Sequence, residues 1–251
     1  MGLHGTPRPP QSPAPTAPVS AVQRYGLSDQ GWPYCPWPCT TLVEDYLTEN
    51  WSEDSLQHLT QEAVRQRRYS GALMLLDHLI ERCPQQASYY NNRGLVYLWC
   101  HHYVEALADF DRALQRDPQL DQAYNNRATA YAALGSLTLA IPDYERTLAI
   151  NPFNTRARIN LGVTWRDLGQ FEQALLCFDE ATLFYQLSEH IYAERGRTYH
   201  LRGDWNCALA DYYRSLGGLA TLPPTPTLAA LQQRVQRWID ELLPSDQPRT
   251  P

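Results

Sequence analysis

The sequence repeats itself with a period of 34 residues from residue 53 onward. If Glu53 is position 1, the later units begin at Ala87, Asp121, Thr155 and Glu189. Position 20 is alanine in all five units, position 8 is Gly, Ala or Thr, and position 24 is Leu, Phe or Tyr. A fixed period without insertions predicts a stack of like units, because each unit must bury its apolar face against its neighbours.

Two antiparallel helices in each unit explain these residue choices. A small residue at position 8 facing alanine at position 20 lets the two backbones approach closely, and large side chains at positions 11 and 24 fill the remaining space. Proline at position 32 ends the second helix, because it has no amide hydrogen and restricts the preceding residue. The first three units carry this proline as Pro84, Pro118 and Pro152.

This pattern of small, aromatic, alanine and proline positions resembles the tetratricopeptide repeat. The resemblance implies an all-α solenoid with five helix-turn-helix repeats, at residues 53–86, 87–120, 121–154, 155–188 and 189–222. The first unit departs most from the pattern, with Thr60 at position 8. The Asn-Asn-Arg openings of two repeats and the absence of lysine are similar to bacterial, cyanobacterial-like repeat proteins.

Four further segments flank the repeats. Residues 1–40 hold nine of the nineteen prolines and predict a disordered Pro-rich leader. Residues 41–52 predict an N-terminal helix, residues 223–243 a C-terminal capping helix and residues 244–251 a tail. The capping helix has an apolar stripe, formed by Leu228, Leu231, Val235, Trp238, Ile239 and Leu242. Its polar side chains are expected to face water, and they are Gln232, Gln233, Arg234, Gln236, Arg237 and Glu241.

Composition excludes several classes of function. The chain has no lysine, which removes a phosphate-loop lysine and Schiff-base chemistry. A net charge of −6 argues against a nucleic-acid partner. We expect a cytoplasmic protein, because the sequence lacks a long apolar stretch and a signal peptide, and because its six cysteines lack the spacing of a secreted scaffold. Peripheral membrane association and self-association stay open.

Nothing in the sequence indicates an enzyme. It shows no nucleophile–base–carboxylate arrangement, glycine-rich phosphate loop or paired-histidine zinc motif, so we expect no cofactor. The run from Cys100 to His102 falls in the turn of the second repeat, and adjacent residues cannot converge on one ion.

The most conspicuous motif outside the repeats is formed by Cys35 and Cys39. Their C-x3-C spacing has no second pair nearby that would complete a zinc site. We favour a tethering role in which Trp32, Tyr34 and Trp37 pack on the solenoid. The alternative is a thiol- or metal-responsive regulator that uses Cys35 and Cys39.

Asparagines recur on one side of the first helices, which carries positions 2, 5, 6, 9 and 13. In tetratricopeptide proteins this side lines a concave groove. Position 6 is Asn92, Asn126 and Asn160 in three consecutive repeats, and position 5 is Asn91 and Asn125 in two. An amide donates and accepts hydrogen bonds, and the resemblance implies an asparagine ladder that binds an extended peptide. The alternative is that asparagine merely tolerates a solvated face.

Three arginines lie beside this predicted ladder. Arg156, Arg166 and Arg197 occupy positions 2, 12 and 9 of their repeats. Guanidinium groups pair with carboxylates, so an acidic segment or a free C-terminus is the expected ligand, although ordinary surface charge is the alternative. The hypothesis is a non-catalytic scaffold or assembly factor that binds a segment of a protein partner.

Positions 7 and 23 vary together along the repeats. Where one is charged the other has the opposite charge, and where one is apolar so is the other. Both positions are equally far from the turn of an antiparallel pair, so they should face each other. The predicted ion pairs are Arg93–Asp109, Arg127–Asp143 and Arg195–Asp211.

Overall fold

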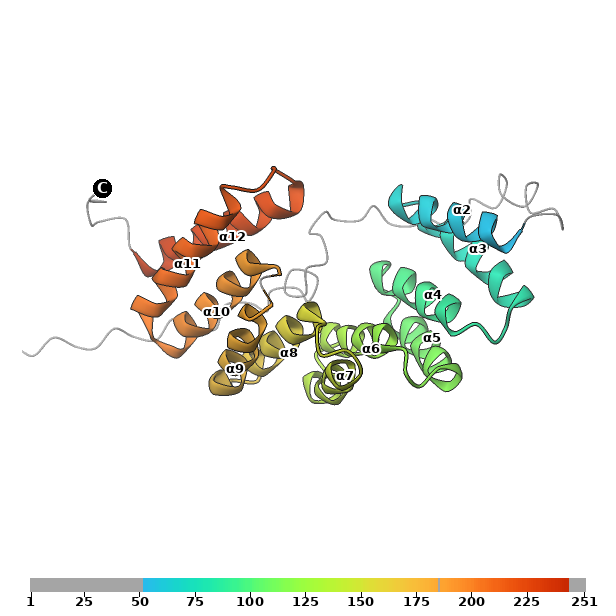
Figure 1. Ribbon diagram of the computed structural model, residues 1–251, viewed down its shortest axis with the longest axis horizontal. Helices are drawn as coiled ribbons and strands as arrows, with labels where there is room; N and C mark the ends of the chain where they lie inside the picture. The colour runs from blue at the N-terminus through green and yellow to red at the C-terminus, as the bar shows by residue number, and fades with distance from the viewer. Residues whose placement is uncertain (1–51, 185, 244–251) are drawn as a thin grey trace, which may run out of the picture.

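The computed structural model describes residues 52–184 and 186–243, and this part of the chain contains helices and turns but no strand (Figure 1). The predicted leader (1–40), nearly all of the predicted N-terminal helix (41–52), and the predicted tail (244–251) lie outside the described residues. None of the described helices is long and apolar enough to cross a membrane.

Ten of the helices form five pairs. They are α2 (Glu53–Arg65) with α3 (Tyr69–Arg82), α4 (Ala87–Trp99) with α5 (Tyr103–Arg116), α6 (Asp121–Ala133) with α7 (Leu137–Ile150), α8 (Thr155–Asp167) with α9 (Phe171–Thr182), and α10 (Ser188–Arg202) with α11 (Trp205–Leu219). An eleventh helix, α12 (Pro226–Leu242), packs against the last pair. The predicted all-α solenoid is confirmed.

The pairs stack into an arc (Figure 1). Helices α2 and α12 lie near its two ends, and α6 and α7 form its base. Helices α4, α6 and α8 face the hollow of the arc, whereas α5, α7 and α9 lie on the outside. The first helices that carry the asparagines therefore lie on the inner side of the arc.

Each pair turns at the same position of the 34-residue unit. Position 15 has a left-handed backbone in all five, with φ from 59° at Arg67 and 62° at His101 to 77° at Gly135 and Gly169 and 97° at Gly203. Glycine adopts this conformation without the steric penalty of a Cβ. The segment around His101 is thus the predicted tight turn.

The small residue at position 8 packs closely against the large side chain at position 24 of the second helix. A Cβ atom added to Gly162 would lie 2.9 Å from the buried ring of Phe178, so only a glycine fits without rearrangement. The same close approach occurs between Gly94 and Phe110. Helices α3, α5 and α7 each end two residues before their predicted proline.

The predicted apolar stripe of α12 caps the last pair. Leu231, Val235 and Ile239 are buried, and they belong to one cluster with Tyr212 and Leu219 of α11. This helix therefore covers apolar surface that a following repeat would otherwise cover.

Candidate peptide-binding face

The inner face is defined here by positions 2, 5, 6, 9, 12 and 13 of α4, α6, α8 and α10. All five predicted asparagines lie on it, at different depths. Asn91 and Asn160 are buried, Asn125 and Asn126 are half-buried, and Asn92 is exposed.

Four of these amides form one hydrogen-bonded chain, which we call the amide chain. Asn125 Nδ2 donates to Asn126 Oδ1 at 3.3 Å, and Asn126 Nδ2 donates across to Asn91 Oδ1 of the preceding repeat at 3.0 Å. Asn91 Nδ2 then donates to Asn92 Oδ1 at 3.4 Å. The chain therefore runs from α6 to α4 and ties two repeats together through their inner face.

One end of the amide chain has an unused acceptor. Asn125 Oδ1 is buried and has no hydrogen-bond partner within the described residues. A buried acceptor without a partner costs free energy. At the other end Asn92 is exposed. In α8 the equivalent of Asn125 is Ile159, so the fifth asparagine, Asn160, has no amide beside it at position 5.

The three predicted arginines have different surroundings. Arg156 is exposed and makes no ion pair within the described part of the chain. Arg166 is buried and donates to Glu194 at 2.6 Å. Arg197 donates to Glu241 of α12 at 2.6 Å and lies over the ring of Trp238. Thus Arg156 is the most accessible of the three.

Glu194 forms a buried charge cluster at the end of the inner face. It accepts from Arg166 of α8 and, at 2.9 Å, from Arg234 of α12. Burial alone would raise the pKa of Glu194, but Arg234 and Arg166 outweigh it and hold the pKa below its ordinary value. The expectation that Arg234 faces water is wrong, because this side chain turns inward to Glu194.

The sequence contains one signal of this cluster, which covariation within a repeat does not reveal. Glu194 is at position 6, where the three preceding repeats carry asparagine. In the fifth repeat, the residue at the asparagine position therefore attaches α12 to α10 through its ion pair with Arg234. Arg234 and Arg197 also lie on the ring of Trp238, at 5.1 and 5.3 Å from its centroid, which strengthens the same attachment.

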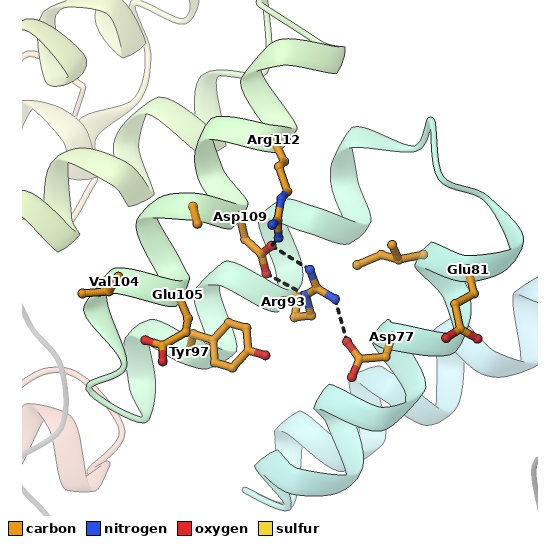
Figure 2. Close-up of a pocket in the computed structure, with 10 residues that line it drawn as sticks. Asp77, Glu81, Arg93, Tyr97, Val104, Glu105, Asp109 and Arg112 are labelled. Atoms are coloured by element: carbon orange, nitrogen blue, oxygen red, sulfur yellow. Dashed lines mark hydrogen bonds and ion pairs between the residues drawn. The ribbon is translucent and has the colours of Figure 1, made fainter.

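The predicted ion pairs between positions 7 and 23 are confirmed. Arg93 donates to both carboxylate oxygens of Asp109, at 2.6 and 2.7 Å (Figure 2). Its third nitrogen donates to Asp77 of the preceding repeat at 2.6 Å. The third and fifth repeats have the same arrangement, in which Arg127 contacts Asp143 and Asp111, and Arg195 contacts Asp211 and Asp179. We call this three-residue arrangement a clasp.

Figure 2 shows the first clasp inside an open pocket of about 550 Å³ between α3, α4 and α5. Its two arginines, Arg93 and Arg112, both donate to the buried carboxylate of Asp109. These charges already have partners, so the pocket serves the joint between two repeats.

The predicted thiol motif cannot be placed, since Cys35 and Cys39 lie outside the described residues. Within the described ranges, no group of three or more His, Cys, Asp or Glu side chains is arranged to hold a metal ion. Burial raises the pKa of Cys177 to about 11, so its thiol is protonated and weakly nucleophilic at neutral pH.

Paired helices at a 34-residue period, stacked into an arc, define a helical-repeat solenoid, a class whose extended faces bind other proteins. Residues 87–120 and 122–154 match the tetratricopeptide repeat family. These two segments are therefore similar to tetratricopeptide repeats in sequence.

Solved structures share this fold. TTC0263, a thermophilic tetratricopeptide protein of Thermus thermophilus, is 20% identical with a TM-score of 0.62, over 75% of this chain and 99% of its own. A MamA protein is 16% identical with a TM-score of 0.58, over 69% and 98%. MamA from Desulfovibrio magneticus RS-1 is 17% identical with a TM-score of 0.59, over 66% and 93%. No curated protein sequence matches the chain significantly.

Proposed function

We propose that this protein is a non-catalytic scaffold or assembly factor that binds an extended segment of a protein partner on its inner face. The observation that carries the proposal is the amide chain, which lies on the inner face and ends at the exposed amide of Asn92. Amides both donate and accept hydrogen bonds, so they suit a peptide backbone whatever its side chains. An extended segment presents such groups at regular intervals along its length.

The charge near the amide chain favours an acidic ligand. Arg156 is exposed on α8, and a guanidinium group binds a carboxylate with two parallel hydrogen bonds. Arg166 and Arg197 support the site differently, since the pair Arg166–Glu194 joins α8 to α10 and the pair Arg197–Glu241 joins α10 to α12. Affinity should fall as salt rises, because exposed charges are screened.

The test uses the full-length protein as bait and compares retained partners by quantitative mass spectrometry. We expect the triple variant Asn92→Ala/Asn126→Ala/Asn160→Ala to lose partners that the unmodified protein retains, by about a hundredfold if each lost amide removes about 1 kcal/mol. Gln115→Ala, at an exposed residue of α5 outside the inner face, is the matched control. Equal retention by all three proteins, with unchanged circular dichroism, would place the binding surface elsewhere.

A further inference from the structure

We propose that residues 25–40 of this same chain occupy the inner face when no partner is bound, so that a partner must displace them. This inference rests on the proposed function of the inner face as a peptide-binding surface. The observations behind it are the chemistry of the inner face, the composition of residues 25–40, and their distance along the chain from α2.

Residues 25–40 have the composition of a ligand for such a face. Trp32, Tyr34 and Trp37 supply large apolar side chains. Prolines at 33, 36 and 38 restrict φ, and such a composition favours an extended backbone whose carbonyl groups can accept hydrogen bonds. Asp29 is the one charged residue in the segment, so nothing in it repels Arg156.

The described inner face offers matching groups. The amide chain ends at the exposed Asn92, whose amide can donate to and accept from an extended backbone. Beside the amide chain, Leu95, Trp99 and Ala133 are partly exposed at positions 9 and 13. Aromatic side chains gain free energy by covering apolar surface of this kind. The inner face and residues 25–40 therefore both combine polar groups with apolar side chains.

Because residues 25–40 are covalently connected to the solenoid, they compete for its inner face more strongly than the same segment of a second copy does. Residue 40 lies twelve residues before Ser52, where α2 is capped. Twelve extended residues span up to ~40 Å, which is comparable with several helix diameters. A short tether gives an effective concentration on the order of millimolar. Even with a weak intrinsic affinity, the tethered segment then occupies the inner face at protein concentrations too low for a second copy to bind.

The test is intramolecular photo-crosslinking in the full-length protein at submicromolar concentration. A benzophenone amino acid replaces Gln122, which is exposed at position 2 of α6, and in a matched control it replaces Gln115, which is exposed on α5. We expect crosslinks from position 122 to residues 25–40 within one chain, at least tenfold more abundant than from position 115. Crosslinks to another segment, to a second copy, or to nothing would overturn the inference.

A second variant tests the aromatic contribution. Trp32→Ala/Trp37→Ala should lower the crosslink yield from position 122 several-fold and raise partner capture. Trp205→Ala, at a tryptophan 59% exposed on α11, should change neither. The two proposals fail separately. Capture that depends on the asparagines without a crosslink refutes the occupancy by residues 25–40 alone, whereas a crosslink with capture indifferent to the asparagines refutes the partner site.

Discussion

At the scale of single residues, the arginine at position 7 joins carboxylates from two repeats. Arg127 donates two hydrogen bonds of 2.7 Å to Asp143 of its own repeat and one of 2.6 Å to Asp111 of the preceding repeat. Asp143 is buried, whereas Asp111 is half exposed. The buried carboxylate therefore depends on Arg127 for compensation of its charge, and the exposed one does not.

Removing one charge of this pair should cost much more than removing both. We expect Asp143→Leu to lower the free energy of unfolding by about 3–5 kcal/mol, because it leaves a partly buried guanidinium group with less compensation. The double variant Arg127→Leu/Asp143→Leu should be far milder, since two apolar side chains can pack there. Urea denaturation of the two variants decides the matter, and equal losses would contradict this explanation.

Glu194 predicts how stability depends on pH. Its pKa is lowered in the folded protein, so its stabilising contribution is present at neutral pH and is lost as the pH falls through that lowered value. Unfolding free energies measured between pH 7 and 3 should fall less steeply below about pH 4.5 in Glu194→Gln than in the unmodified protein. Parallel pH profiles would show that Glu194 titrates normally.

Some of these contacts were predictable from the sequence, and others were not. Arg93 and Asp109 vary together within one repeat, so their pairing followed from the antiparallel geometry. The contact to Asp77 depends on how neighbouring repeats are rotated, which covariation within a repeat does not reveal. The acidic residues at position 25 of four repeats were an available signal.

At the scale of helices, one joint lacks a clasp. In the fourth repeat, positions 7 and 23 are Leu161 and Cys177, and the acidic residue of the preceding repeat, Glu145, is exposed. The other three joints between repeats each have an arginine that bonds to both sides. The joint between α7 and α8 therefore depends more on apolar packing.

A clasp can be built into this joint. We expect Cys177→Asp alone to destabilise the protein, because burial at this site already raises the pKa of the thiol and disfavours a charge. Adding Leu161→Arg should recover about 1–3 kcal/mol of that loss. A thermodynamic cycle from urea denaturation measures this coupling. Additive effects of the two substitutions would mean that positions 7 and 23 do not meet in this repeat.

The boundaries of the helices were predictable where the sequence contains a strong stop signal. Helices α3, α5 and α7 end before their prolines, as predicted. The fourth repeat has Gln186 in place of this proline, α9 has 12 residues, and α10 begins at Ser188 after a left-handed Leu187. The local turn therefore differs where the proline is missing.

At the scale of the whole molecule, the stack places side chains of successive repeats on one continuous surface. The 34-residue register predicted which asparagines share the inner face. It did not predict that Asn126 donates to Asn91, or that Arg166 is buried against Glu194, because both contacts depend on the rotation between neighbouring pairs. The sequence therefore predicts which positions share this surface, whereas the hydrogen bonds and ion pairs between them follow only from the structure.

The amide chain gives the most direct test of the proposed function, through the dissociation constant of a captured partner segment. We expect Asn126→Ala to weaken binding by about 1–2 kcal/mol, roughly 5- to 30-fold, because the peptide loses a hydrogen bond and the link to Asn91 is broken. Gln115→Ala should leave the constant unchanged. An affinity equal to that of the unmodified protein, in a variant shown to be folded, would contradict the assignment of the inner face as the binding surface.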